Sequence, residues 1–205
     1  MAFCTKLLPS ESIPGQSSMA SINKKQLQTL HQEKTLRSRS NWTVLIANHE
    51  NPLSESAIDC CWELFSDVHA KALELATFPI PRKYLEVASS TEGWELLILH
   101  KAECKDKLPA GFLICNKLGD EYAPLLCGID YSLQDMGLYQ NMLLASITRA
   151  RELGFATVDL GMASNCEKKR LGCVPVEHTM CFHVNNEDMM EGVQMPVIIS
   201  ERLGF

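Results

Sequence analysis

The residue pattern with the clearest chemical potential is the turn from Gln134 to Tyr139, which reads Gln-x-x-Gly-x-Tyr. It stands at the expected start of a helix over residues 138–153. The first N–H groups of a helix have no partner inside the helix and carry partial positive charge, so main chain alone can bind a phosphate there. In this interpretation N–H groups near Gly137, Leu138 and Tyr139 hold a phosphate, and Gln134 adds a side-chain donor.

The same turn also has a purely structural interpretation. Asp135 would then be an ordinary N-cap, and Gly137 would only ease the start of the helix. A basic run further along, Lys168, Lys169 and Arg170, has two interpretations as well. It is either a solvated cationic helix end, or it binds a phosphate or a developing oxyanion. The residues alone leave both alternatives open.

Thiol nucleophiles and metal sites find little support. Cys166 stands at the start of the basic helix, where a thiolate would be stabilised. The nearest histidines, His178 and His183, are an odd number of positions apart in an expected strand and therefore face opposite sides. The chain has neither a C-x-x-C nor an H-E-x-x-H motif. We expect no resident metal ion.

Length and composition predict one folded domain behind an irregular arm. A chain of 205 residues with 46% hydrophobic residues can bury one substantial core. Residues 1–40 are rich in Ser, Lys, Gln and Pro, and we expect a disordered or linker-like arm. A weak helical pattern over Ser21–Leu36 would allow a partner contact there. Residues 41–205 form the predicted domain.

The charge and the cysteines limit the class of protein. A net charge of -6 argues against a large nucleic-acid footprint, which needs a concentrated basic face. Cysteines such as Cys115 and Cys127 lie inside apolar runs, as free core thiols do in a reducing compartment. The N-terminus lacks the apolar core of a secretory signal, and no apolar run reaches membrane-spanning length. We expect a cytoplasmic protein that binds neither nucleic acid nor membrane.

Hydrophobic periodicity predicts an alternation of strands and helices. Residues 42–47 are expected to be the first strand, and a helix should begin at Ser56, three residues before Asp59 in a capping-box pattern. The later expected elements are strands 94–100, 111–116 and 122–130, helix 138–153, strand 156–160, helix 164–171 and strand 175–184. This order predicts an α/β (α+β) fold with a mixed, mostly antiparallel sheet and helices on both faces.

The order of these motifs resembles the GNAT acyltransferase fold. In that fold the fourth strand and the next helix bind the pyrophosphate of CoA through a (Gln or Arg)-x-x-Gly-x-(Gly or Ala) turn. Gln134 and Gly137 match this turn, whereas Tyr139 replaces the small residue and Asp135 adds a carboxylate. The resemblance covers roughly residues 42–184.

A narrower resemblance concerns three further motifs. Gly128–Tyr131, Leu160–Met162 and Lys168–Cys173 are similar to a GNAT-like branch. That branch is found in peptidoglycan-biosynthesis-type proteins and in domains fused to amino-oxononanoate-synthase-like enzymes. It is related in turn to the Fem-type aminoacyltransferases.

The resemblance implies an N-acyltransferase that uses acetyl-CoA or another acyl-CoA as co-substrate. The acceptor would be an amino group of a small metabolite, amino sugar or peptide. Such a transfer needs a base for the ammonium and a proton for the leaving thiolate, and the candidates are Asp130, Tyr131 and Lys168. The residues expected to bind the donor are Ile129, Gln134, Gly137, Leu138 and Tyr139.

Two other functions are compatible with the same resemblance. The chain lacks a conventional base and acid, which favours a catalytically inactive GNAT-fold accessory or interaction module. A Fem-like transferase that takes an aminoacyl group from tRNA is a minor alternative. Two GNAT-like domains and a basic surface would be expected there, whereas this chain is acidic.

Overall fold

The structure is a computed structural model that describes residues 2–7, 38–71, 80–103, 108–161 and 165–178. Its seven-stranded sheet has the order β2-β3-β4-β5-β6-β1-β7. Neighbouring strands are antiparallel except for the parallel pair β5 and β6. The strands are β1 (Ala2–Leu7), β2 (Trp42–Asn48), β3 (Trp94–Lys101), β4 (Pro109–Leu118), β5 (Glu121–Ile129), β6 (Thr157–Asp159) and β7 (Val174–His178). The predicted mixed, mostly antiparallel sheet is confirmed.

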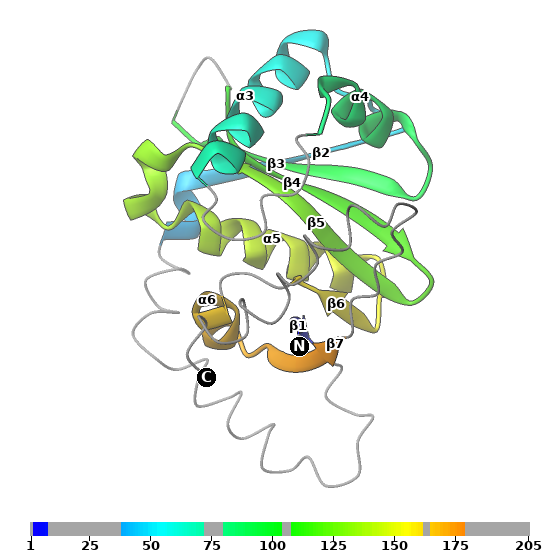
Figure 1. Cartoon of the computed structure of the whole chain (residues 1–205). Helices are drawn as coiled ribbons and strands as arrows, with labels where there is room; N and C mark the ends of the chain where they lie inside the picture. The colour runs from blue at the N-terminus through cyan, green and yellow to red at the C-terminus, as the bar shows by residue number, and fades with distance from the viewer. Residues whose placement is uncertain (1, 8–37, 72–79, 104–107, 162–164, 179–205) are drawn as a thin grey trace, which may run out of the picture.

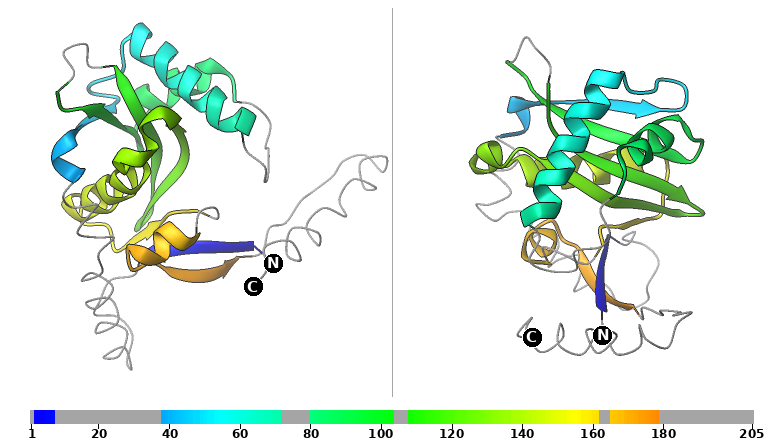
Figure 2. Two further views of the ribbon diagram at one scale, coloured as in Figure 1. Left: turned by 90° about the vertical axis from the view of Figure 1, so that its left-hand side faces the viewer. Right: turned by 45° about the horizontal axis from the view of Figure 1, so that its top comes forward.

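Helices cover both faces of the sheet, as predicted. α3 (Glu55–Lys71) and α4 (Arg82–Ser90) lie on one face, and α5 (Leu138–Glu152) lies on the other (Figure 1). The short helix α6 (Asn165–Arg170) lies beside β7, at the end of the sheet that also contains β1 (Figure 2). Two short 3-10 helices, η1 (Arg39–Asn41) and η2 (Tyr131–Met136), precede β2 and α5.

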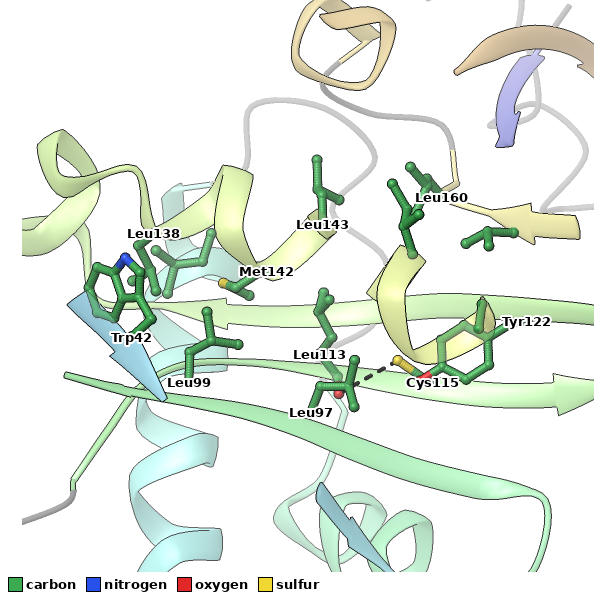
Figure 3. Close-up of a cluster of buried hydrophobic side chains, with 14 of the residues drawn as sticks. Trp42, Leu97, Leu99, Leu113, Cys115, Tyr122, Leu138, Met142, Leu143 and Leu160 are labelled. Atoms are coloured by element: carbon green, nitrogen blue, oxygen red, sulfur yellow. Dashed lines mark hydrogen bonds between the residues drawn. The ribbon is translucent and has the colours of Figure 1, made fainter. Parts of the chain in front are cut away.

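Strands β3 and β4 are apolar on both faces and are covered by helices on each side of the sheet. Leu96 and Ile98 pack with α3 and α4, whereas Leu97 and Leu99 join the cluster under α5. This alternation follows from the two-residue period of a strand. Figure 3 shows the α5 cluster, in which Leu138 and other α5 side chains lie against strand residues.

Two glycines in adjacent strands let helices approach the sheet closely from opposite sides. A Cβ atom at Gly128 in β5 would lie 2.8 Å from the backbone nitrogen of Phe65 in α3. A Cβ atom at Gly111 in β4 would lie 2.8 Å from Sδ of Met142 in α5. The register places Gly111 opposite Ile129, next to Gly128. α3 and α5 therefore share one narrow part of the sheet.

A buried carboxylate holds the other end of α5 to the sheet. Glu95 in β3 is 0% exposed. It accepts hydrogen bonds from Arg149 Nε at 3.0 Å and Nη2 at 3.1 Å, and from Tyr122 Oη at 2.8 Å. Lys117 Nζ lies 2.8 Å from its second oxygen. Burial raises the pKa of Glu95, but the hydrogen bonds from Arg149, Lys117 and Tyr122 outweigh burial and leave that pKa below its usual range.

The sequence predicted no helix or strand for residues 82–93, and the structure corrects this. These residues contain α4, whose buried residues Leu85, Ala88 and Ser89 follow helical spacing. Only two of these are apolar, which is too few to mark a helix from pattern alone. Arg82 fixes this helix to α3 through ion pairs with Glu55 and Asp59.

The start of α3 also differs from the prediction. Ser54, not Ser56, stands at the N-cap, because its carbonyl accepts the N–H of Ile58 and its hydroxyl accepts the N–H of Ala57 at 3.4 Å. The Ser56 hydroxyl instead lies 3.2 Å from that of Ser54. α3 is described as far as Lys71, and residues 72–79 lie outside the described part of the chain.

Trp42 does not begin the first strand of the sheet. β1 precedes it and is hydrogen-bonded to both β6 and β7, with Lys6 opposite Asp159 and Cys4 opposite Val176. The pairing partners are more than 150 residues away, so local pattern gave no sign of it. The rest of the expected arm, residues 8–37, lies outside the described residues, as do positions 179–184 of the expected last strand. The boundary at residue 41 stays a prediction.

We predict that Gly128→Ala destabilises the fold by about 1–3 kcal/mol, because the added methyl would meet the Phe112 ring and the Phe65 backbone, and that backbone cannot move alone. Gly111→Ala should cost less, since the flexible Met142 side chain can retreat. Urea denaturation of both variants measures this difference. Equal losses, or a larger loss for Gly111→Ala, would contradict the proposed tight α3 contact.

We predict that Glu95→Gln lowers the free energy of unfolding at pH 7 by roughly 3 kcal/mol, because two cations lose their buried partner. The folded-state pKa of Glu95 lies below the ordinary value of 4.5, so its contribution is complete above that pH and is lost as pH falls through the lowered pKa. Wild type and variant should therefore converge in acid. Glu152→Gln, which removes an exposed carboxylate 3.7 Å from the same arginine, is the control and should change little.

Candidate functional site

The predicted phosphate-binding turn is the start of α5. Gly137 is the N-cap residue, in the left-handed conformation at φ 73°, and no side chain caps the helix. The first turn contains no acidic residue. Asp135 lies earlier, in η2, and is exposed, so the alternative in which Asp135 is the N-cap is wrong. No side-chain cap and no acidic residue of the first turn therefore competes with an anion at the start of α5, and the phosphate site there stays a prediction.

The side chains of this turn have different surroundings. Leu138 is completely buried in the core, so only its backbone can serve a ligand. Tyr139 is half-buried and packs against the same cluster, which accommodates a large side chain where the family pattern has a small one. The side chain of Gln134 lies outside the described part of the chain.

An opening in the sheet lies beside this turn. Within the described residues, β5 and β6 pair only at Glu121 with Thr157 and at Tyr122 with Val158. The later part of β5 continues to Ile129 while paired with β4 alone. One edge of β5 is therefore available for another extended chain, such as an amide-containing ligand.

The register decides which groups of β5 face this opening. The N–H of Asp130 donates to Ala110 O at 2.8 Å, on the β4 side. Peptide groups alternate along an antiparallel strand, so those of Cys127 and Ile129 point toward the opening. Ile129 fits the prediction of a backbone contact, whereas the Asp130 N–H is already used. Cys127 was not predicted, because orientation depends on register.

The catalytic candidates at the end of β5 have different partners. Asp130 Oδ1 accepts hydrogen bonds from the Ser132 N–H at 2.9 Å and hydroxyl at 2.7 Å, so this carboxylate caps the turn of η2. Tyr131 is half-buried, with Lys71 Nζ 4.2 Å from its ring centroid. Burial chiefly raises the pKa of Tyr131, with help from Cys127 and Asp67, so its phenol keeps its proton.

Lys168 is buried and is not part of a solvent-exposed helix end. Its side chain is only 2% exposed, and Nζ donates to the carbonyl of Gly161 at 3.0 Å. That bond ties α6 to the turn after β6, where Gly161 has φ 71°. Lys169 and Arg170 are exposed, as a solvated helix end would be. The basic run therefore contains one buried cation and two surface cations.

Four residues near the turn were not predicted from the sequence: Ser38, Gln140, Asn141 and Glu167. The Asn141 side chain, 4% exposed, donates to Gly137 O and to Ser38 Oγ, both at 2.9 Å. Gln140 Nε2 donates to Glu167 Oε2 at 3.1 Å and so connects α5 with α6. Only the helical positions of Gln140 and Asn141 after Gly137 could have indicated them, since Ser38 and Glu167 are distant in sequence.

The described thiols behave as core residues. Burial raises the pKa of Cys115 and Cys173 to about 12 and that of Cys127 to about 11, the nearby charge of Lys168 opposing the last two shifts. In the described ranges no three His, Cys, Asp or Glu side chains come close enough to hold a metal ion. No helix in those ranges is long and apolar enough to cross a membrane. The Cys166 and His178 side chains and all of His183 lie outside the described part.

The sequence pattern of the acetyltransferase (GNAT) domain matches residues 25–169, which include the turn, the opening and most of α6. The chain belongs to the GNAT acetyltransferase family. No curated protein sequence matches this GNAT chain significantly. The resemblance to GNAT proteins is confirmed, whereas nothing tests the narrower branch.

Solved structures share the fold of this GNAT domain at low sequence identity. An aminoglycoside acetyltransferase from an uncultured soil metagenomic sample, in complex with sisomicin, has a TM-score of 0.52 and 14% identity, with 72% of this chain and 97% of that chain covered. The C-terminal domain of a protein named as a lysylphosphatidylglycerol synthetase, from Agrobacterium fabrum, gives 0.52 and 16%, covering 80% and 48%. L-PGS from Bacillus licheniformis gives 0.46 and 12%, covering 79% and 45%.

The two structures with a TM-score of 0.52 share the fold of this chain, and at 14% and 16% identity they do not show a shared substrate. The GNAT chain spans about half the length of the two synthetase structures, so it corresponds to one part of such proteins. It corresponds to nearly all of the aminoglycoside acetyltransferase. GNAT enzymes as a family transfer an acyl group from acyl-CoA.

Proposed function

We propose that this protein is an acyl-CoA-dependent N-acyltransferase that transfers an acetyl or other acyl group directly to an amine in a ternary complex. One observation carries the proposal: the uncapped start of α5 lies next to the open edge of β5. A donor with a pyrophosphate and a peptide-like arm needs both features together. Membership of the GNAT family supports the same reaction class.

The donor site follows from main-chain geometry. N–H groups of Gly137, Leu138 and Tyr139 would hold the pyrophosphate at the positive end of α5. The outward peptide groups of Cys127 and Ile129 would pair with the amides of the pantetheine arm, as an added strand would. The thioester would then lie in the opening near Cys127, which is close enough to Tyr131 to affect the pKa of its phenol.

The acceptor in this proposal is an amino group of a small metabolite, amino sugar or peptide. The neutral amine attacks the thioester carbonyl, the C–S bond breaks as the amide bond forms, and the leaving thiolate takes up a proton while the nitrogen loses one, which restores the proton donor. Tyr131 is suited to give that proton, because its raised pKa keeps it protonated at neutral pH. Asp130 would act mainly by shaping η2, since Ser132 already occupies its Oδ1.

Lys168 has a positioning role in this proposal. Its bond to Gly161 fixes the turn after β6, which borders the opening. Its positive charge also lies near Cys127, one of the residues whose peptide group faces the opening. A clamp on the donor phosphate is less suitable for an ammonium group that is already buried against a carbonyl.

We predict that Gly137→Ala weakens acyl-CoA binding about tenfold or more. At φ 73° a side chain strains the turn, and its Cβ would lie 3.1 Å from Ser38 Oγ, so the N–H groups would shift. Gly154→Ala is the control, because Gly154 has φ 81° with open space and follows the other end of α5. Thermal shift with acetyl-CoA, CoA and longer acyl-CoAs measures binding; wild type at 100 times the dissociation constant should gain roughly 2.7 kcal/mol.

The contrast between the two alanine variants decides the donor site. Both should lose similar stability, and only Gly137→Ala should lose the response to acyl-CoA. Equal responses would remove the start of α5 as the site. No response of wild type to any CoA compound would overturn acyl-CoA dependence and favour the inactive GNAT-fold module.

We predict that Tyr131→Phe lowers kcat for acyl transfer roughly 100-fold and leaves the acyl-CoA dissociation constant unchanged, because only the proton donor is lost. The pKa of Tyr131 lies above its ordinary value of 10.0, so wild-type activity should decline only in strongly alkaline buffer. That decline should vanish in the variant. Chromatographic measurement of CoA release with a panel of amines gives the pH profiles.

Tyr84→Phe is the matched control for this experiment. Tyr84 is also half-buried and has a pKa raised by burial, but it lies on α4 against Trp94. Its loss should leave kcat and the pH profile unchanged. A wild-type rate in Tyr131→Phe would assign the proton transfer to another group.

A further inference from the structure

The outer edge of β2 lacks the features that keep edge strands from pairing. β2 stands first in the strand order, so in the described ranges only its β3 side is paired. Its sequence, Trp-Thr-Val-Leu-Ile-Ala-Asn, contains neither proline nor a charged residue. Val44 and Leu45 are 49% and 43% exposed. An edge of this kind is a template for another strand.

The direction of the peptide groups in β2 shows which of them face the outer edge and not β3. Asn41 O accepts the N–H of Ala102 at 2.8 Å, on the β3 side. Peptide groups alternate along an antiparallel strand. Those of Val44 and Ile46 therefore point away from β3, toward the open edge.

Both ends of this edge are already closed by the chain itself. The N–H of Trp42 donates to Arg39 O. Asn48 exchanges two hydrogen bonds with Asn51, at 3.1 and 3.0 Å. The open groups among the described residues are thus concentrated at the centre of β2, around Leu45.

A hollow runs beside this edge, on the α5 side. It measures about 230 Å³, and its lining includes Trp42, Val44 and Ile46 from β2 and Leu144 and Ala145 from α5. An apolar surface next to an open strand edge can be covered by the same partner that pairs with the strand.

Exposed residues of opposite charge line the two ends of the hollow, and the half-buried Arg149 lies 3.7 Å from the negative one. Arg39 lines it at the Trp42 end of β2. Glu152 lines it near Arg149, which binds Glu95, and Glu95 stands opposite Asn48 in the register. The positive and negative groups therefore lie at opposite ends of the strand, and both residues are exposed.

We propose that a second copy of this chain pairs with β2 through a two-fold axis at Leu45. Antiparallel pairing about that axis sets Val44 opposite the partner's Ile46, which joins the open peptide groups of both copies. The Trp42 end of one strand then lies beside the Asn48 end of the other. Arg39 consequently approaches the partner's Glu152, and the contact occurs twice because the interface is isologous.

Sedimentation velocity of the full chain at several concentrations tests this dimer. Wild type should sediment as a dimer, and Leu45→Lys should be monomeric, because two like charges would meet at the axis. Leu118→Lys is the control, since Leu118 is 71% exposed at the end of β4 and should leave the dimer intact. A monomeric wild type, an open-ended polymer, or an unchanged dimer in folded Leu45→Lys would overturn the proposal.

Charge reversal tests the orientation of the two copies. Arg39→Glu should weaken the dimer about tenfold, and adding Glu152→Arg should restore it. Failure of the second change to restore the dimer would overturn the antiparallel arrangement.

Amide hydrogen exchange tests the dimer on the wild-type protein alone, so the result does not depend on whether a variant folds. The N–H groups of Val44 and Ile46 should be protected at high protein concentration and exposed on dilution. Protection that is independent of concentration would show that the same chain covers the edge, and would overturn the second copy.

Discussion

The close approach of α3 and α5 to one part of the sheet is the constraint on which the rest of the structure depends. Gly128 leaves room for the α3 backbone on one face, and Gly111 leaves room for Met142 of α5 on the other. Both contacts occur where β4 pairs with the end of β5. They therefore fix the position along these strands at which α5 begins. The turn that we propose binds phosphate thereby lies beside the last residues of β5.

The other end of α5 is held by a different kind of interaction. Glu95 is buried with two cations and a phenol around it, and a buried charge of this kind tolerates little displacement. The helix is thus held by close packing near Gly137 and by charge near Arg149. Between these points β5 and β6 diverge, and the opening results from a sheet that is tightly held on one side only.

Hydrophobic period alone was sufficient to predict β3, β4, β5 and α5, because each is long and mostly buried. α4 was missed because a nine-residue helix with few large apolar residues has a weak pattern. β1 was missed because its partners are far away in sequence. In the site, local spacing was sufficient to predict Gly137 at the start of a helix. Asp130 was a catalytic candidate only because it is a carboxylate, since its hydrogen bonds to Ser132 depend on how the chain turns after β5.

The electrostatics of the donor site follow from these placements. The chain has a net charge of -6, and Asp135 is exposed next to the turn, so long-range attraction of an anionic donor is weak. Lys168 is buried against Gly161 and adds little direct contact. In the proposed function, recognition of a pyrophosphate therefore depends mainly on oriented N–H groups at the start of α5. Those groups are correctly oriented only while Gly137, the N-cap of α5, keeps its left-handed conformation. The packing of α5 against Gly111 holds this helix in place.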